Sequence, residues 1–369
     1  MTDLIPVTLL TGFLGAGKTT LLNRLIADPA LAEALVLINE FGEIGLDHEL
    51  VSGVSGEMML MASGCLCCTI RSDLVRELGT KAIERRQAKL RFSRVVIETT
   101  GLADPAPILH ALMSDPVLRE QYRLDGVITV VDAVSGGRTL DRQEEAVKQA
   151  AVADRLVLTK TSLPGADADG LKQRLALLNP SAPILTPEET TPAQLFNVGL
   201  FNPETKTLDV QRWLRAEAYP TLPVAAEAKD HSHDHGHDHR EHDHHHGHDH
   251  HHHDHQDPNR HDARIRALCL ILEQPVPWDA FALWAESLAL YRGDNILRLK
   301  AIIHAEGEAQ PIAVHGVQHL FHPPARLPAW PSPDRRSRIV VIARDLEPEA
   351  IRQSLLAALE EARRAAPAA

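Results

Sequence analysis

The sequence predicts an α/β domain with a mostly parallel sheet, followed by a smaller α+β domain. Two observations predict this order. Short β-rich runs alternate with helical stretches over residues 1–190, and a second set of strands and helices follows a His/Asp tract that contains no apolar residue. Strands that alternate with helices form βαβ units, whose strands run parallel beneath covering helices. A chain of 369 residues is long enough for two such domains.

The strands predicted for the first domain are short runs rich in apolar and β-branched residues. They are Val7–Thr11, Leu35–Asn39, Arg94–Glu98, Gly126–Val131 and Arg155–Thr159. Helical patterns cover Lys18–Ala27, Asp73–Arg86 and Asp141–Ala150. The run from Gly126 to Val131 is almost continuously apolar, which is typical of a strand buried on both faces of a parallel sheet.

The second domain is predicted from a shorter set of elements. Its strands are Ile265–Leu272, Ile296–Ile303, Ile312–Val317 and Ile339–Ala343, and its helices are Trp278–Leu290 and one that begins at Pro348. We therefore expect a first domain over residues 1–215, a disordered His/Asp-rich linker over 216–262 and an α+β domain over 263–362.

The linker holds most of the histidine in the chain. Sixteen of the 22 histidines lie between His231 and His261. The segment Lys229–Asp262 contains nine acids and three bases, so it carries a net charge of −6, which is half of the −12 of the whole chain. Such a tract cannot form an apolar core. Its imidazoles can bind several divalent metals with little selectivity, so it predicts a metal reservoir. A solvated, pH-responsive linker is the alternative.

The composition argues against several other classes of protein. A net charge of −12 disfavours a nucleic-acid-binding surface, and no apolar run reaches the roughly 18 residues of a membrane span. Three of the four cysteines are packed into Cys65-Leu-Cys67-Cys68, a spacing that favours thiolate chemistry in a reducing compartment over disulfides. We expect a cytoplasmic protein without a nucleic-acid or membrane partner.

A phosphate-binding loop follows the first predicted strand. The segment Gly12-Phe-Leu-Gly-Ala-Gly-Lys-Thr19 fits G-x-x-x-x-G-K-[ST] and leads into a helix, so the first domain is expected to be a P-loop NTPase. In such a loop, backbone N–H groups surround the β-phosphate, the lysine bridges the β- and γ-phosphates, and the hydroxyl is a Mg²⁺ ligand. The predicted nucleotide contacts are Gly12, Gly15, Ala16, Gly17, Lys18, Thr19 and Thr20.

A carboxylate ends the predicted strand Arg94–Glu98. Glu98 is expected to support Mg²⁺ or its water, and the N–H of Gly101 is expected to sense the γ-phosphate. Glu in place of the more familiar Asp adds a methylene, which favours a water-mediated contact. Lys18, Thr19 and Glu98 are therefore the predicted catalytic residues.

Base recognition is expected after the strand Arg155–Thr159. Small GTPases use Asn-Lys-x-Asp at this place, whereas this chain has Thr159-Lys160-Thr161-Ser162. Lys160 can stack on the base, with Thr159 and Thr161 beside it. Ser162 cannot supply the charge-assisted hydrogen bond of an Asp, worth about 1.5–3 kcal/mol, so these residues alone leave both GTP and ATP open.

The cysteine cluster lies between the phosphate loop and Glu98. Three thiolates within four residues suit a soft or borderline ion such as Zn²⁺ or Cu⁺. The flanking Gly64 indicates a loop. Ligands from elsewhere are expected to complete the site, and the candidates are Glu40, Glu43, Asp47 and His48. The alternative is that the cysteines are small buried hydrophobic residues. The histidines of the second domain and Cys269 are expected to be structural; these histidines are His304, His315, His319 and His322.

Together these segments resemble the CobW-type metallochaperone GTPases, relatives of the HypB and UreG nickel-insertion GTPases. The resemblance rests on segments that recur in the order of the family: Gly12–Thr20, Asn39–Glu43, Gly64–Cys68, Glu98–Pro105 and Leu158–Thr161, with Val317–Phe321 and Trp330 in the second domain. Ser162 departs from the family, which usually keeps Asp there.

The resemblance implies a GTP-hydrolysing protein that uses Mg²⁺ and carries a transition metal to a client metalloprotein. In the family, the Cys-x-Cys-Cys thiolates bind the metal near the switch segments; here they are Cys65, Cys67 and Cys68, joined by Glu40. Zn²⁺ is the expected ion. Co²⁺, for cobalamin synthesis or a cobalt enzyme, is its main rival. A homodimer is left open.

Two other classes of function compete with this interpretation. A metal storage or buffer protein would have a vestigial nucleotide site, and the intact Lys18, Thr19 and Glu98 argue against it. A small-molecule P-loop kinase would have no use for the Cys-x-Cys-Cys segment.

Overall fold

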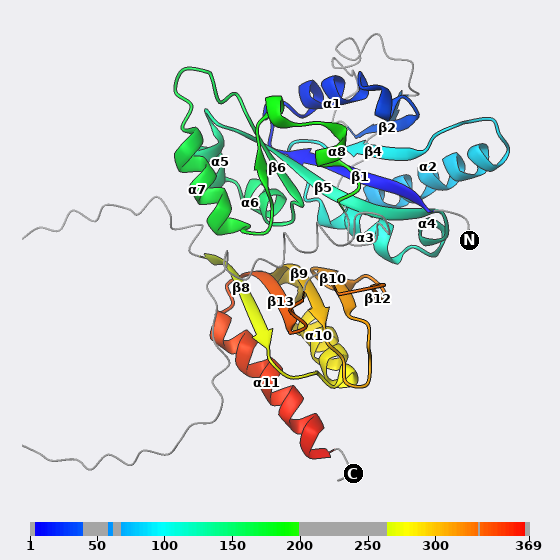
Figure 1. The fold of residues 1–369 in the computed structure, drawn as a ribbon. Helices are drawn as coiled ribbons and strands as arrows, with labels where there is room; N and C mark the ends of the chain where they lie inside the picture. The colour runs from blue at the N-terminus through cyan, green and yellow to red at the C-terminus, as the bar shows by residue number, and fades with distance from the viewer. Residues whose placement is uncertain (1–3, 40–57, 62–67, 199–263, 331–332, 366–369) are drawn as a thin grey trace, which may run out of the picture.

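The computed structural model describes residues 4–39, 58–61, 68–198, 264–330 and 333–365. The first domain, which contains the phosphate loop, and a smaller C-terminal domain lie one above the other (Figure 1). The linker expected over 216–262 and the boundary expected at residue 215 lie outside the described residues. No described helix combines the length and the apolarity that a membrane crossing requires.

The first domain is built on a seven-stranded sheet with the order β3-β2-β4-β1-β5-β6-β7. Every neighbouring pair is parallel. The strands are β1 (Ile5–Gly12), β2 (Ala34–Asn39), β3 (Met58–Met61), β4 (Arg94–Glu98), β5 (Tyr122–Asp132), β6 (Arg155–Thr159) and β7 (Ile184–Leu185). Because the strands are parallel, the carboxyl ends of β1, β4, β5 and β6 lie next to one another along the same edge of the sheet.

Helices cover both faces of this sheet because its strands bury side chains on both sides. On β1, Leu10 packs with α1 (Lys18–Ile26) and α8 (Pro192–Leu195), whereas Leu9 packs on the opposite face. The helices that pack on that opposite face are α2 (Cys68–Arg86), α3 (Ala106–Ser114), α4 (Pro116–Gln121), α5 (Gly136–Arg142), α6 (Glu144–Ala151) and α7 (Ala168–Leu178). This arrangement confirms the predicted α/β fold class.

The prediction of a single helix over Asp141–Ala150 is wrong. α5 ends at Arg142 and α6 begins at Glu144, because Gln143 has an extended backbone with φ −126° and ψ 109°. Each short helix buries its own apolar residues, with Leu140 on α5 and Ala150 on α6. Packing against the sheet therefore outweighs the continuous helical pattern of the sequence.

The C-terminal domain is an antiparallel sheet with two helices on one face, which confirms the predicted α+β class. Its strands are β8 (Ile265–Leu272), β9 (Ile296–Ile303), β10 (Ile312–Val317), β11 (Leu320–Phe321), β12 (Ala325–Arg326) and β13 (Ser337–Arg344), in the order β11-β10-β9-β13-β8 with β12 on β10. α10 (Trp278–Arg292) and α11 (Pro348–Ala365) pack against alternate strand residues such as Leu268 and Leu270.

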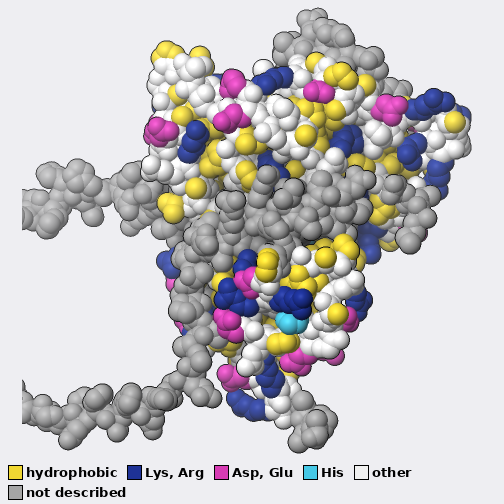
Figure 2. Space-filling view, in the orientation of Figure 1, with side chains coloured by type: hydrophobic (Ala, Val, Ile, Leu, Met, Phe, Trp, Pro, Cys, Tyr) yellow, Lys and Arg dark blue, Asp and Glu magenta, His cyan; other side chains and the backbone are white. Residues whose placement is uncertain are grey.

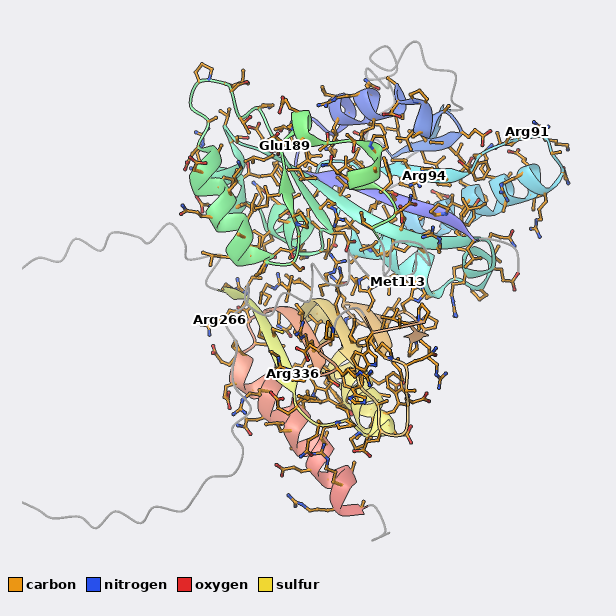
Figure 3. All side chains as sticks on the ribbon, viewed as in Figure 1. Arg91, Arg94, Met113, Glu189, Arg266 and Arg336 are labelled. Carbon is orange, nitrogen blue, oxygen red and sulfur yellow. The ribbon has the colours of Figure 1, made fainter. Side chains whose placement is uncertain are left out.

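The other face of this second sheet packs against the first domain. Cys269 and Leu297 form one apolar cluster with Ala151, at the end of α6. A second contact joins α3 to β10, where His110 Nε2 lies 2.9 Å from the Val317 oxygen. Met113 of α3 lies at the same junction (Figure 3). The two domains thus share a buried interface through α3 and α6.

Candidate nucleotide site

The phosphate loop joins β1 to α1 at the edge where the parallel strands end. Gly17 caps α1 in the left-handed region, at φ 93°, which is a conformation that favours glycine. The Lys18 side chain is buried, and its Nζ donates to the oxygens of Gly12 at 2.9 Å and Phe13 at 3.4 Å. The ammonium therefore lies over the loop itself. The predicted contact residues from Gly12 to Thr20 all belong to this loop and the first turn of α1.

Glu98 and Thr19 are brought together although 79 residues separate them. The Thr19 hydroxyl donates to Glu98 Oε1 at 2.7 Å, and the Glu98 side chain is 4% exposed. Mg²⁺ prefers hard oxygen ligands, and a hydroxyl beside a carboxylate at a phosphate loop supplies them. The residues present therefore fit a magnesium ion held by Thr19, with Glu98 at its side.

The segment after β4 lies directly against the phosphate loop. Thr99 donates its backbone N–H to the Leu10 oxygen at 3.0 Å, and its hydroxyl donates to Thr11 Oγ1 at 2.9 Å. A Cβ at Gly101 would lie 2.5 Å from the Leu14 nitrogen, so only glycine fits there without a shift of the backbone. Gly101 thus touches the loop whose ligand it is expected to sense.

The segment after β6 closes the other side of the loop. The Thr159 hydroxyl donates to the Ala16 oxygen at 2.7 Å, and Lys160 Nζ donates to the Gly15 oxygen at 2.8 Å. Thr161 follows on the same turn. Thr159 and Lys160 are therefore fixed beside the phosphate loop, which is where the sequence predicts base recognition.

Asp132, at the end of β5, is a site residue that the sequence analysis missed. Its Oδ2 accepts from Lys160 Nζ at 2.7 Å, and its Oδ1 accepts from the Val134 N–H at 2.7 Å. Burial opposes ionisation of this carboxyl, but the Lys160 ammonium and the backbone donors outweigh it and lower the pKa of Asp132. Its place at the end of a buried strand, at the edge shared with β1 and β6, is the signal that could have identified it.

The predicted metal ligands are only partly within the described residues. Glu40, Cys65 and Cys67 lie outside them, as do the candidates Glu43, Asp47 and His48. Cys68 is the first residue of α2, so the loop expected around the cysteines ends one residue earlier than the sequence indicated. Among the described residues, no three His, Cys, Asp or Glu side chains gather as a metal site.

The histidines of the C-terminal domain are expected to be structural, and His304 and His319 make local contacts of that kind. His304 packs edge-on to Trp330 at 5.2 Å between ring centroids. His319 Nε2 lies 2.9 Å from Asp294, which raises the pKa of His319. His315 is buried, and burial beside two cations lowers its pKa well below the usual range. Burial likewise raises the pKa of the Cys269 thiol to about 11, as expected for a core cysteine.

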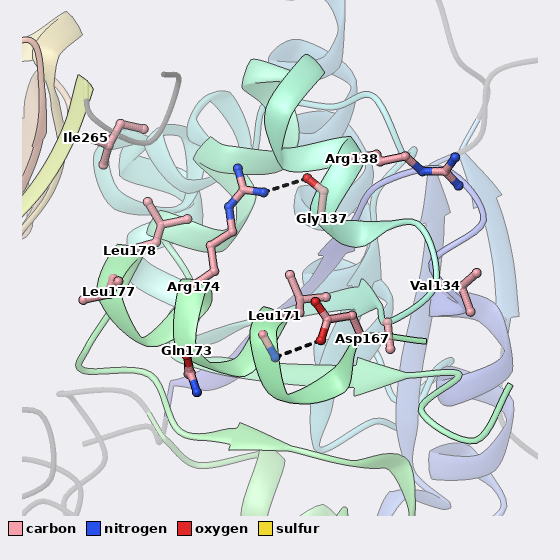
Figure 4. Close-up of a pocket in the computed structure, with 12 residues that line it drawn as sticks. Val134, Gly137, Arg138, Asp167, Leu171, Gln173, Arg174, Leu177, Leu178 and Ile265 are labelled. Atoms are coloured by element: carbon pink, nitrogen blue, oxygen red, sulfur yellow. Dashed lines mark hydrogen bonds between the residues drawn. The ribbon is translucent and has the colours of Figure 1, made fainter. Parts of the chain in front are cut away.

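A separate cavity of about 640 Å³ lies between α5 and α7 (Figure 4). Arg174 lines it, but this guanidinium donates to the Gly137 oxygen at 2.8 Å and pairs with Asp141 at 2.7 Å. Asp167 caps α7 by accepting the Gly170 N–H at 3.0 Å. None of the predicted site residues lines this cavity.

The face drawn in Figure 2 carries charges of both signs interspersed over both domains, as far as the described residues show.

Comparison with known protein families gives two matches along the chain. Residues 6–186 match the model described as the CobW/HypB/UreG nucleotide-binding domain. Residues 265–359 match the model described as the cobalamin synthesis protein cobW C-terminal domain. The two matches therefore cover the two domains of the structure.

Comparison with individual proteins extends this likeness over nearly the whole chain. The zinc chaperone YjiA of Escherichia coli (strain K12) is 31% identical over 350 residues, which are 94% of this chain and 96% of the relative. The zinc-regulated GTPase metalloprotein activator 1 of Schizosaccharomyces pombe is 37% identical, covering 53% of this chain and 48% of the relative. The crystal structure of zinc-bound YjiA GTPase from E. coli covers 97% of this chain and 99% of that chain, at 29% identity and a TM-score of 0.64.

Proposed function

The chain belongs to the CobW/HypB/UreG family, and from this premise we propose that it is a GTP-hydrolysing metallochaperone that delivers zinc to client metalloproteins. The observation that carries the hydrolytic part is the 2.7 Å hydrogen bond between the Thr19 hydroxyl and Glu98. It joins a phosphate loop to the carboxylate of a neighbouring strand, which is the arrangement that P-loop NTPases use around Mg²⁺.

The residues of this site divide the work by their positions. Lys18 leaves the carbonyls of its own loop to bind the β- and γ-phosphates, because a charge-assisted bond is stronger than a bond to a neutral oxygen. The N-terminus of α1 adds a partial positive charge to the same phosphates. Gly101 presents its N–H beside the loop. Lys160 and Thr159 orient the base, with Thr161 beside them.

Magnesium is the cofactor in this proposal, held by the Thr19 hydroxyl with Glu98 at its side. When bound, it neutralises charge on the phosphate oxygens. The departures at Thr159 and Ser162 weaken a guanine-specific contact, so the preference for GTP rests on the relatives that are named GTPases. We therefore treat ATP as the competitor that the assay must include.

Zinc is the cargo in this proposal, bound by the thiolates of Cys65, Cys67 and Cys68 together with Glu40. Thiolate and carboxylate donors suit Zn²⁺, and two relatives are named zinc chaperone or zinc-regulated. Thiolates must stay reduced to bind metal, and for this reason we propose a cytoplasmic location. The same ligand set would accept Co²⁺, so a cobalt chaperone is the second candidate for this site.

The decisive experiment is a GTPase assay on the full-length chain with Zn²⁺, Co²⁺ and Ni²⁺ titrated separately and ATP as the competing nucleotide. The proposal expects GTP turnover that responds to Zn²⁺ at lower concentration than to the other two ions. A stronger response to Co²⁺ would favour the cobalt chaperone. Metal binding without turnover of GTP or ATP would favour a storage protein with a vestigial nucleotide site.

A further inference from the structure

Gln149 is a buried amide for which the nucleotide motifs do not account. It lies on α6, its side chain is 0% exposed, and its Nε2 donates to the Ala103 oxygen at 2.9 Å and to the Gly101 oxygen at 3.2 Å. Because both partners are carbonyls, the NH₂ end of the amide must face this loop. Burying an amide is unfavourable unless such bonds form, so the side chain is committed to holding the segment between β4 and α3.

The same segment is held from its opposite side by the phosphate loop. Thr99 donates to the Leu10 oxygen, and the backbone of Gly101 approaches Leu14 so closely that a Cβ would lie 2.5 Å from its nitrogen. Residues 101–103 thus lie between the phosphate loop and α6. Any movement of this segment relative to α6 must change its bonds to Gln149.

α6 itself is anchored on the sheet. The main-chain oxygen of Gln149 accepts from the Thr129 hydroxyl of β5 at 2.7 Å. A second contact leads from the same helix to the same segment, since Lys148 Nζ lies 3.2 Å from Asp104 Oδ2. Gln149 is therefore a fixed point against which the segment is positioned.

The C-terminal end of α6 reaches the second domain. Ala151 packs with Cys269 and Leu297, and the Val152 oxygen accepts from Arg298 Nη1. The helix that holds the Gly101 segment is thus also part of the domain interface. The distance along the chain from Gln149 to that interface is only two residues.

We propose that Gln149 is a positioning residue for nucleotide hydrolysis, which holds the Gly101–Ala103 segment against the phosphate loop and links it through α6 to the C-terminal domain. The peptide N–H and C=O groups point in opposite directions, so fixing the Gly101 and Ala103 oxygens also fixes the N–H groups of Leu102 and Asp104. The inference rests on the proposed GTPase function, and it assigns a positioning role to a residue that lies outside the nucleotide-binding motifs.

The test uses Gln149→Met and Gln149→Leu in the full-length chain, because both replace the buried amide by an apolar side chain of similar size that has no donor. The kcat for GTP should fall about tenfold or more, since small displacements of positioned groups are costly in rate. The Kd for a fluorescent GDP should change less than about twofold, because the phosphate loop and Lys160 keep their own bonds. Tyr122→Phe is the matched control: it removes a buried hydrogen bond to a main-chain oxygen, that of Leu78 at 2.9 Å, at the opposite end of β5, and it should retain kcat.

The outcomes separate this inference from the proposed function. A wild-type chain that neither binds nor hydrolyses GTP would sink the proposed function. A wild-type chain that hydrolyses GTP, with kcat unchanged in both Gln149 variants, would overturn the inference. A parallel loss of kcat and GDP affinity that Tyr122→Phe reproduces would show a merely structural role and overturn it too.

Hydrogen exchange on the wild-type chain keeps the inference testable even if the variants do not fold. Addition of a non-hydrolysable GTP analogue should slow exchange of the amides of Leu102, Asp104 and α6 together, relative to GDP. Slower exchange in the Leu102–Asp104 segment without any change in α6 would contradict the link.

Discussion

The Lys18 ammonium bonds to two carbonyl oxygens of its own loop, Gly12 and Phe13. It is buried, so these bonds offset the loss of hydration that a buried cation would otherwise suffer. Phosphate oxygens are better acceptors for an ammonium because they carry charge. The same side chain thus has a stable position in the loop and a stronger partner in the nucleotide.

Replacing Lys18 tests the phosphate loop. Lys18→Ala should lower the GTP turnover of the proposed enzyme by roughly 100-fold or more, because one positioned donor to developing charge is removed. The fold should persist, since the loop keeps its backbone bonds such as Ala16 N to the Phe13 oxygen at 3.1 Å. Turnover and circular dichroism on heating are the measurements, and the exposed Lys89→Ala is the control. Normal turnover in Lys18→Ala would exclude the P-loop assignment.

The local motif made Lys18 and Thr19 predictable, because strand, loop and helix follow one another in the sequence, and a P-loop protein then needs a carboxylate such as Glu98 at the end of another apolar strand. No motif called for Asp132 or Gln149. Asp132 meets Lys160 across 28 residues, and Gln149 meets Gly101 across 48. No short pattern encodes such contacts; they arise only when parallel strands and a covering helix converge at one edge of the sheet.

The loop between β4 and α3 is the element on which the nucleotide response depends. Gly101→Ala should move this loop, because the new Cβ would lie 2.5 Å from the Leu14 backbone nitrogen, which cannot rotate away. We expect GTP turnover to fall at least about tenfold while the fold remains. Gly137→Ala on α5 is the control, since nothing lies within 4 Å of its Cβ position. Turnover equal in both variants would show that contact with Leu14 is unimportant.

At the scale of elements, the sequence was most informative where burial is uniform. Arg94–Glu98 and Arg155–Thr159 are strands with the bounds that their apolar runs predicted. The helix expected over Asp141–Ala150 was wrong because its periodicity continues across Gln143, where the backbone is extended. Tertiary packing of two short helices decided that case, and a single sequence contains little information about it.

At the scale of the whole molecule, one buried carboxylate joins the domains. Asp154 Oδ1 lies 2.6 Å from Arg298 Nη2 and 2.7 Å from Lys300 Nζ, and all three side chains are buried. Its Oδ2 accepts the Val127 N–H at 3.0 Å. Burial opposes ionisation of this group, but the two cations outweigh it and hold the pKa of Asp154 far below its usual range.

Asp154→Asn should destabilise the protein by about 3–5 kcal/mol at pH 7, because it leaves two buried cations without their carboxylate. The folded-state pKa lies below the unfolded one, so the stabilisation is complete above about pH 4 and is lost as the pH falls further. Urea unfolding at pH 7 and pH 3 measures both effects, and the variant should lose less stability on acidification.

The control for this interface is Asp345→Asn, which removes an exposed partner of Arg264. Such a pair contributes about 0–1 kcal/mol, so its loss should be small at both pH values. If Asp154→Asn unfolds at the same urea concentration as the wild type, the ion pairs of Asp154 with Arg298 and Lys300 do not hold the domains together.

We expect the affinity for Zn²⁺ to depend on which nucleotide is bound. Cys68 begins α2, and Leu78 of α2 packs in one cluster with Leu109 of α3, the helix that follows the Gly101 segment. If nucleotide state moves that segment, the start of α2 is biased with it. Zn²⁺ affinity should then differ between a GTP analogue and GDP by about 5–150-fold, the usual range of such couplings.

Competition with a chromophoric chelator in each nucleotide state measures this difference, and it should be done in a chain lacking residues 230–256 so that the histidine tract does not mask the cysteine site. Linkage requires that Zn²⁺ change the affinity for the GTP analogue, relative to GDP, by the same factor. Equal Zn²⁺ affinity in the two states would mean that α2 and α3 do not transmit the state of Gly101, and release of the metal would then depend on the client alone.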